Sequence, residues 1–269
     1  MAENLMLAFA LTLLAGLATG IGSILAFFTS RTNTRFLSLA LGFSAGVMIY
    51  VSMVEIFVKA KDALTGELGA ELGNWLTVAG FFGGMILIAL IDKWIPKQGN
   101  PHELKRVEEM TDSKQAVNDP TLLKMGTFTA LAIAIHNFPE GIATFTAALQ
   151  DPALGAAIAI AIAIHNIPEG IAVSVPIYFA TGDKKKAFKL SFLSGLSEPV
   201  GAIAAWLFLM PFLNDVMFGV IFAGVAGIMV FISLDELLPA AKKYDETHLS
   251  IYGLMGGMAV MALSLLLII

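Results

Sequence analysis

The chain has 269 residues, of which 57% are hydrophobic and 14% charged, and its formal net charge at pH 7 is −5. Soluble domains contain roughly 45–50% apolar and about 25% charged residues, so this composition excludes an ordinary soluble domain and indicates a polytopic membrane protein. The chain has no cysteine, which excludes disulfides and thiolate metal ligands. The modest net charge gives no indication of a nucleic-acid partner.

A helix that crosses a bilayer needs about 20 mostly apolar residues. The sequence predicts eight such spans, at about 5–28, 35–58, 74–95, 124–149, 153–180, 187–211, 216–239 and 249–269. The first follows an N-terminus without a basic region, which favours a retained span over a cleaved signal peptide. We therefore expect one all-α transmembrane domain over residues 1–269.

Glycine pairs four residues apart recur in the first, second and eighth spans. They are Gly16 and Gly20, Gly42 and Gly46, and Gly253 and Gly257. Small residues at this spacing let helix backbones approach closely, which predicts a tightly packed bundle. The pattern fits packing within one chain as well as a homodimer.

Lysine and arginine collect in alternate connections, which predicts the orientation in the membrane. The connections after the odd-numbered spans hold Arg31, Arg35, Lys93, Lys97, Lys105, Arg106, Lys114, Lys124, Lys184, Lys185, Lys186, Lys189, Lys242 and Lys243. The opposite side has Lys59 and Lys61, in a predicted loop that also carries Asp62, Glu67 and Glu71. We expect the basic connections to be cytoplasmic and both termini to face outward.

The longest connection, about 97–123, is polar and bounded by prolines, so we predict a mobile cytoplasmic loop. His102 and its acidic neighbours could bind metal weakly, and the alternative is a solvated linker. We expect the run Lys184–Lys186 to anchor the chain beside anionic lipid head groups.

One phrase occurs twice, in the fourth and fifth spans. Residues 131–145 read LAIAIHNFPEGIATF and residues 160–174 read IAIAIHNIPEGIAVS. An ionisable residue at the centre of a span is costly and by default marks a site for an ion or a proton. At equal offsets the two copies carry His136, Asn137 and Glu140, and His165, Asn166 and Glu169.

Within each copy the histidine and the glutamate are four residues apart and share one helix face, which the asparagine flanks. This set of nitrogen and oxygen donors suits Zn²⁺, Fe²⁺, Mn²⁺, Co²⁺ or Ni²⁺ better than Mg²⁺ or Cu⁺. The connection 150–152 is very short, so the two spans should be antiparallel neighbours whose histidines meet near the midplane. We predict a metal site between them, a feature typical of transporters.

The prolines of the phrase support this prediction. Pro139 and Pro168 cannot donate a backbone hydrogen bond, so each helix should kink and leave a carbonyl bare. In lipid that is tolerated only where protein, water or an ion supplies a partner. Gly141 and Gly170 should let the kinked segments approach one another. The alternative is that each His–Glu pair is only a structural hydrogen bond.

Further carboxylates lie inside predicted spans. Glu198 precedes Pro199 and is our candidate for completing a second, adjacent metal site. Glu55 could guard the route or relay protons. Asp235 and Glu236 lie near the cytoplasmic end of the seventh span, as an exit or as a solvated helix terminus.

These motifs, HNFPEG and HNIPEG followed by SEPVG and DELLP, resemble those of the ZIP family of divalent metal transporters, most closely its bacterial ZupT-like branch. The resemblance implies a 3+2+3 arrangement, in which the first three and last three spans are related by a pseudo-twofold around the fourth and fifth. It also implies uptake of zinc, with iron, manganese, cobalt or cadmium as further substrates, across a bacterial inner membrane. A homodimer is a further expectation, and no resident cofactor is expected.

The resemblance assigns ligands to two adjacent sites. One would use His136, Glu140, His165 and Glu169, and the other Asn137, Asn166, Glu169 and Glu198, with Glu169 bridging. In one respect the chain departs from the family, since the loop after the third span is often histidine-rich there and holds only His102 here.

No GxxxxGK[ST] motif is present, so we expect a secondary transporter or facilitator and not an ATP-driven pump. An intramembrane His/Glu metalloenzyme is the alternative from another class, and the absence of HExxH counts against it. Within transport, the alternative is a metal exporter.

Overall fold

The computed structural model describes residues 4–28, 34–94, 120–212, 214–243 and 248–268. Within these ranges the chain is almost entirely helical and has no β-strand. Of the predicted loop 97–123, residues 97–119, including His102, lie outside the described residues, and 120–123 begin a helix.

The helices follow one another with few interruptions. In order they are α1 (Leu5–Phe28); α2 (Thr34–Tyr50), the π-helix η2 (Val51–Ile56) and α3 (Phe57–Leu68); α4 (Ala70–Trp94); α6 (Pro120–Gln150); α7 (Pro152–Thr181); α8 (Lys184–Gly195), α9 (Ser197–Ala204), the π-helix η3 (Ala205–Leu209) and the 3₁₀ turn η4 (Met210–Phe212); α10 (Asp215–Ile232), the π-helix η5 (Ser233–Leu237) and α11 (Leu238–Lys243); and α12 (Leu249–Ile268). Over the described residues, 7 helical segments are long and apolar enough to cross a membrane. The 31-residue α6 is a further long helix.

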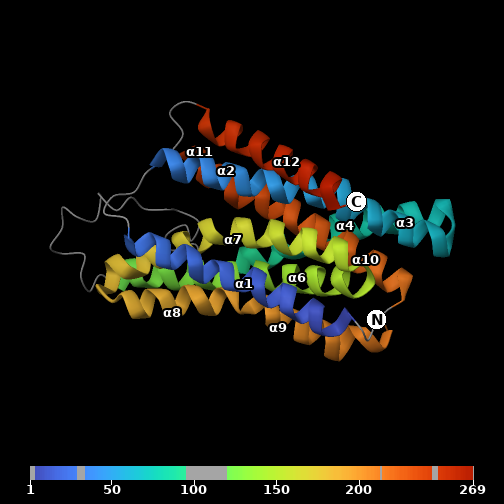
Figure 1. Ribbon diagram of the computed structural model, residues 1–269, viewed down its shortest axis with the longest axis horizontal. Helices are drawn as coiled ribbons and strands as arrows, with labels where there is room; N and C mark the ends of the chain where they lie inside the picture. The colour runs from blue at the N-terminus through green and yellow to red at the C-terminus, as the bar shows by residue number, and fades with distance from the viewer. Residues whose placement is uncertain (1–3, 29–33, 95–119, 213, 244–247, 269) are drawn as a thin grey trace.

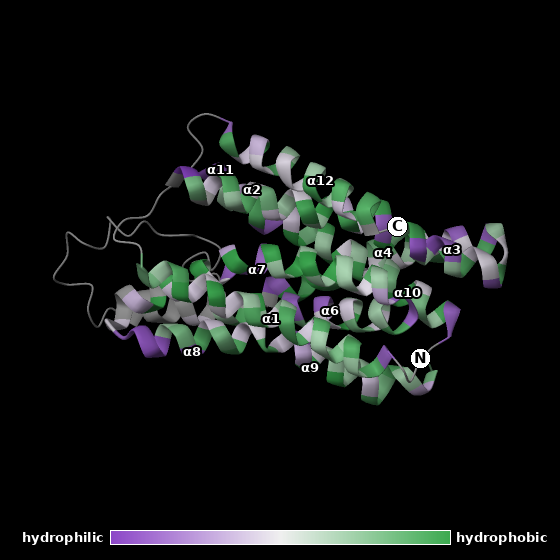
Figure 2. Cartoon of the chain, viewed as in Figure 1, coloured by the Kyte–Doolittle hydropathy of each residue, from purple (hydrophilic) through white to green (hydrophobic). Residues whose placement is uncertain are grey.

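The surface of the bundle is apolar and part of its interior is polar, the reverse of a soluble protein. Leu14, Ile86 and Phe208 are 62%, 60% and 70% exposed, while Thr12 and Ser44 are fully buried. Figure 2 shows hydrophobic residues along the helices and hydrophilic ones gathered at the ends of the bundle, on α3 and at the start of α8. Such a surface is stable against lipid, so the prediction of an all-α polytopic membrane protein is confirmed.

The connection between the second and third predicted spans is helical, which corrects our expectation of a loop. The helix continues through the exposed Lys59 and Lys61 to Leu68, and the chain reverses at Gly69, whose φ is 79°. Glycine adopts this left-handed conformation without strain. Polar side chains showed that this segment meets water, but a helix can project beyond the bilayer as readily as a loop can.

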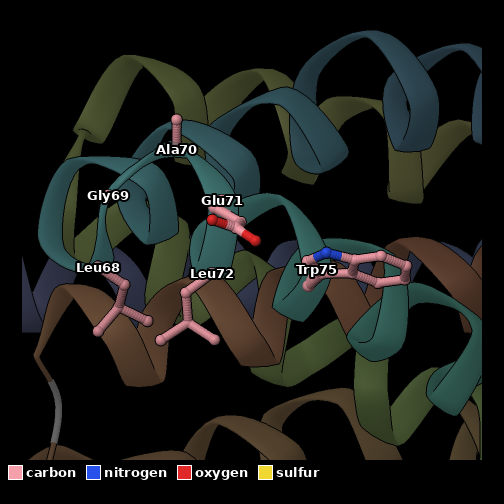
Figure 3. Close-up of a pocket in the computed structure, with 6 residues that line it drawn as sticks. All are labelled: Leu68, Gly69, Ala70, Glu71, Leu72 and Trp75. Carbon is pink, nitrogen blue, oxygen red and sulfur yellow. The ribbon is translucent and has the colours of Figure 1, made fainter.

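A pocket lies at this reversal, lined by residues 68–72 and Trp75 (Figure 3). Glu71 is the one ionisable side chain in the lining. The residues of the repeated phrase are not part of this pocket, so it is separate from the predicted metal site.

Two groups of helices pack around the central pair formed by α6 and α7 (Figure 1). On one side α1 packs against α7 and α8, and α9 packs against α6; on the other, α2 packs against α12 and α4 against α10. An apolar crevice of about 180 Å³ lies between α2, α7 and α12 and is lined by Val47, Ile164 and Met261 among others.

Close contacts at glycines show that the two halves of the chain pack alike. A Cβ at Gly22 in α1 would overlap the carbonyl of Ile167, and a Cβ at Gly201 in α9 would overlap the carbonyl of Phe138. Ile167 and Phe138 occupy the same place in the two copies of the phrase. Helix α1 therefore packs against α7 in the same way as α9 packs against α6.

The outer helices repeat the same relation. A Cβ at Gly257 in α12 would overlap the carbonyl of Phe43 in α2, and a Cβ at Gly84 in α4 would overlap the carbonyl of Gly224 in α10. The second and eighth spans thus pack like the seventh and third. This exchange of partners is what the 3+2+3 inverted arrangement requires.

The glycines of the phrase do not meet each other, which corrects our prediction. A Cβ at Gly141 would overlap the carbonyl of Glu198, and a Cβ at Gly170 would overlap that of Thr19. These glycines admit the flanking helices α9 and α1 to the central pair. The glycine pairs of α2 and α12 face each other within the chain, so their contacts are internal.

The prolines of the phrase do not interrupt their helices. Both α6 and α7 continue as α-helix through Pro139 and Pro168. Because α9 and α1 pack closely at the adjacent glycines, tertiary contacts hold the helix where the backbone hydrogen bond is lost.

The start of α1 and the end of α12 lie at the same end of the bundle, and the start of α8 lies at the other (Figure 1). Lys184, Lys185 and Lys186 are exposed there. The assignment of that end to the cytoplasm, and the count of eight spans, stay predictions from the sequence.

Candidate metal centre

The structure buries all seven predicted ligands in the interior, and contacts join six of them: His136 with Glu169, His165 with Glu140, and Asn166 with Glu198. The amide of Asn137 is buried and makes no hydrogen bond among the described residues. Helix α6 supplies His136, Asn137 and Glu140, α7 supplies His165, Asn166 and Glu169, and α9 supplies Glu198. Each of these side chains is buried, with at most 3% of its surface exposed. Buried charged and amide groups are costly unless they are paired or bind an ion.

The histidines contact the glutamates of the opposite helix. His136 Nε2 lies 3.1 Å from Glu169 Oε1, and His165 Nε2 lies 3.3 Å from Glu140 Oε2. The distance from His165 Nε2 to Glu169 Oε1, within one helix, is longer at 4.0 Å. The spacing within each copy indicates that each histidine neighbours the glutamate of its own helix, but the shorter contacts in the structure join opposite helices.

Asn166 links three helices at the second predicted site. Its Nδ2 donates to the backbone carbonyl of Ala15 in α1, at 2.9 Å, and also to Glu198 Oε1. Because both of these contacts use the amide nitrogen, the oxygen Oδ1 is left to face other groups. The carbonyl of Ala15 was not predictable from the sequence, since any residue carries one.

Hydroxyl groups tie Gly170, the neighbour of Glu169, to the flanking helices. Ser23 Oγ in α1 donates to Ser191 Oγ in α8, at 2.6 Å, and Ser191 Oγ donates to the Gly170 carbonyl, at 3.2 Å. Ser23 Oγ also lies 3.3 Å from that carbonyl. These contacts fix the backbone beside Glu169 and hold α1, α7 and α8 together.

Each of the seven predicted ligands has a buried polar atom without a hydrogen-bond partner among the described residues. These atoms are His136 Nδ1, Asn137 Oδ1 and Nδ2, Glu140 Oε1, His165 Nδ1, Asn166 Oδ1, Glu169 Oε2 and Glu198 Oε2. Leaving a buried polar atom unpaired costs about 1–3 kcal/mol. Purely structural hydrogen bonds do not explain so many unpaired atoms in one place. A bound cation explains them, because it would give these oxygen and nitrogen atoms a partner.

The charges of the cluster also favour a cation. Glu140, Glu169 and Glu198 are carboxylates, and the described residues place only the two histidines in ion-pair contact with Glu140 and Glu169. A divalent ion would neutralise this excess of negative charge. Buried carboxylates without such compensation would be strongly unfavourable.

The spacing of the donor atoms is compatible with zinc. Two ligands of one tetrahedral zinc with bonds of about 2.0–2.2 Å lie about 3.4 Å apart, close to the crossed His–Glu distances of 3.1 and 3.3 Å. Within the described residues, however, no three such side chains already form a complete cage. A bound zinc would therefore need these side chains to move from their positions in this structure.

Glu236 lies beside this cluster, and Asp235 does not. Glu236 is buried in η5, with Oε2 3.9 Å from His136 Nδ1, whereas Asp235 is exposed. The helix continues to Lys243, so neither residue is at a solvated helix terminus. The sequence placed Glu236 near the end of the seventh span, and its burial follows from the continuation of the helix beyond residue 239.

Glu55 lies outside the cluster in this structure. It is half-buried in η2, and its nearest ion-pair partner is Lys59 on the same helix, at 3.9 Å. Asp151, at the turn between α6 and α7, also interacts with it electrostatically.

Comparisons with known proteins show which proteins the chain is similar to. Residues 95–265 match the family model described as ZIP Zinc transporter. The zinc transporter ZupT of Lysinibacillus sphaericus (strain C3-41) is 76% identical over 266 residues, covering 99% of each chain. The ZupT proteins of Oceanobacillus iheyensis and Clostridium perfringens (strain 13 / Type A) are 72% and 60% identical, covering 99% of this chain and 99% and 98% of theirs.

Proposed function

The chain belongs to the ZIP family of zinc transporters, and we propose that it takes up divalent transition metal ions, zinc above all, into the cytoplasm. It is a multi-pass membrane protein, and we place it in the bacterial inner membrane. The observation that carries the proposal is the set of contacts among the buried candidate ligands of α6, α7 and α9: His136 with Glu169, His165 with Glu140, and Asn166 with Glu198.

Two adjacent sites are proposed within this cluster. His136, Glu140, His165 and Glu169 form the first, and the crossed His–Glu contacts support this grouping. Asn137, Asn166, Glu169 and Glu198 form the second, which the contact between Asn166 and Glu198 supports. Glu169 belongs to both, because it lies near both histidines.

Glu236 is the proposed next ligand on the inner side. Its carboxylate lies 3.9 Å from His136 Nδ1, so an ion that leaves the first site towards the basic end of the bundle meets an oxygen ligand at once.

Alternating access arises from rocking of one helix group against the other, as in other transporters with inverted repeats. The apolar crevice between α2, α7 and α12 lies along the boundary between the groups. The driving force is the metal gradient, the membrane potential or protons. The potential alone favours inward movement of a divalent ion by about 4.6 kcal/mol per 100 mV, twice the value for one charge.

A homodimer is the proposed assembly. Since the glycine pairs of α2 and α12 are occupied by contacts within the chain, the dimer must use other surfaces, such as the apolar faces of α4 and α12 that carry Ile86 and Leu263. Chemical cross-linking in membranes tests this assembly. If the treated protein still migrated only with the mass of one chain, the result would contradict a dimer.

The direction of transport is tested by measuring zinc content in bacterial cells that lack the gene, at low external zinc. Uptake predicts that the cells accumulate less zinc and regain it when the gene is restored. An exporter would instead give cells that are sensitive to high zinc and contain more of it.

A further inference from the structure

The second and seventh spans carry the same short pattern within a π-helix. In η2 the sequence is Ser52-Met-Val-Glu55, and in η5 it is Ser233-Leu-Asp-Glu236. Both serines are fully buried. π-helices are rare and often occur at functional sites, so the same pattern in two π-helices is a strong sign of a shared role.

These two segments are equivalent under the pseudo-twofold that relates the first three spans to the last three. The same pseudo-twofold superposes α6 on α7, and therefore His136 on His165, because these residues match in the repeated phrase. Under this pseudo-twofold the contact between α10 and α6 corresponds to the contact between α2 and α7, and the structure contains both contacts. Glu236 and His136 thus correspond to Glu55 and His165.

In the structure only one of these equivalent pairs is in contact. Glu236 Oε2 lies 3.9 Å from His136 Nδ1. Glu55 instead pairs with Lys59 on its own helix, while His165 contacts Glu140 and Glu169. The two halves have therefore adopted different arrangements around the central pair.

We propose that Glu55 is a metal ligand of the outer route, which contacts His165 in the opposite access state as Glu236 contacts His136 here. This inference rests on the proposed transport function. When access alternates in an inverted repeat, the two halves exchange conformations, so a contact made by one half is then made by the other. Glu55 and His165 would then offer the oxygen and nitrogen donors that zinc prefers.

The surroundings of Glu55 suit an entrance for cations. Asp151 interacts with it electrostatically. The Asp151 carboxylate accepts hydrogen bonds from the backbone N–H groups of Ala153 and Leu154 at the start of α7. Asp151 therefore adds negative charge to the route from the bundle end that is predicted to face outward. An incoming ion meets this charge before it reaches His165, which lies deeper in α7.

The first test is kinetic and compares Glu55→Gln with Glu67→Gln, using zinc uptake into proteoliposomes that contain a trapped fluorescent zinc indicator. Glu67 is exposed on α3, so each variant removes one negative charge from the same helical segment. The KM for zinc should rise about tenfold in Glu55→Gln, the effect expected for the loss of one contact with a charged group. In Glu67→Gln it should not change.

An equal rise in KM in both variants would show a general effect of surface charge and overturn the proposal, as would an unchanged KM in Glu55→Gln. If the unmodified protein transported no zinc in these vesicles, the proposed function itself would fail, which is a different result.

The second test does not depend on transport and uses the absence of cysteine from the chain. The double variants Glu55→Cys/His165→Cys and Glu236→Cys/His136→Cys are treated in membranes with a short bifunctional thiol reagent, beside the control Glu67→Cys/His165→Cys. Both equivalent pairs should cross-link and the control should not. Cross-linking of the Glu236 pair without the Glu55 pair would refute the exchange.

Discussion

Neutralising Glu169 should impair zinc transport more than neutralising Glu140, although both residues occupy the same place in the repeated phrase. Glu140 lies near one histidine, at 3.3 Å from His165. Glu169 lies near two, at 3.1 Å from His136 and 4.0 Å from His165. These contacts favour Glu169 as the carboxylate that bridges the two sites. Zinc transport should therefore fall further in Glu169→Gln than in Glu140→Gln.

The size of the effect follows from the number of contacts. One contact with a charged group contributes about 1.5–3 kcal/mol, which corresponds to about a 10- to 150-fold change in apparent affinity. Glu140→Gln should fall within this range. Glu169→Gln should lie at its upper end or beyond, since a second contact weakens as well.

The assay is the initial rate of zinc entry into proteoliposomes as a function of zinc concentration, with the exposed Glu71→Gln as control. Glutamine has nearly the same shape as glutamate, so packing is preserved and the charge is removed. A larger loss for Glu140→Gln than for Glu169→Gln would refute the bridging role of Glu169.

Three further predictions concern metal binding and packing. Histidine and glutamate must be deprotonated to bind metal, so zinc affinity measured by titration should be weaker at pH 5 than at pH 7.5, and equal affinities would count against this ligand set. Glu198→Gln should lower the number of zinc ions bound per chain by one in equilibrium dialysis; an unchanged number would remove Glu198 from the second site. Gly257→Leu should lower the thermal unfolding temperature, because a side chain there meets the carbonyl of Phe43 and overpacking costs about 1–3 kcal/mol. The same substitution at Gly83, which has open space around it, should leave the unfolding temperature nearly unchanged.

The sequence predicted that the polar side chains of the repeated phrase lie in neighbouring buried segments, because residue type and depth within a span are local properties. His136 and His165 stand in matching apolar segments joined by a short turn, and the cost of burying them indicated an ion site. The pairing of the ligands could not be predicted in the same way. The i,i+4 rule describes one helix, whereas the contact of His136 with Glu169 depends on the rotation and depth of two helices.

The same limit explains the other differences. Gly141 was expected to meet Gly170, but it meets the carbonyl of Glu198 in α9. A glycine pattern predicts that another helix approaches closely, but it does not identify which helix. Lys59 and Lys61 were placed in a loop because charge reports exposure to water and not backbone conformation. The π-helices of η2 and η5 have no simple sequence signal, and only their position in the bundle revealed that Glu55 and Glu236 correspond.

The most direct measurement is zinc entry into sealed proteoliposomes with a trapped fluorescent indicator, for the unmodified protein, His165→Ala and His248→Asn. His165 is fully buried in the proposed site, whereas His248 is exposed and distant in sequence, with a φ of 62° that asparagine also tolerates. We predict rapid entry with the unmodified protein and with His248→Asn, and none above background with His165→Ala. Undiminished entry with His165→Ala, or zinc that binds to the unmodified protein and never reaches the vesicle interior, would contradict transport through this site.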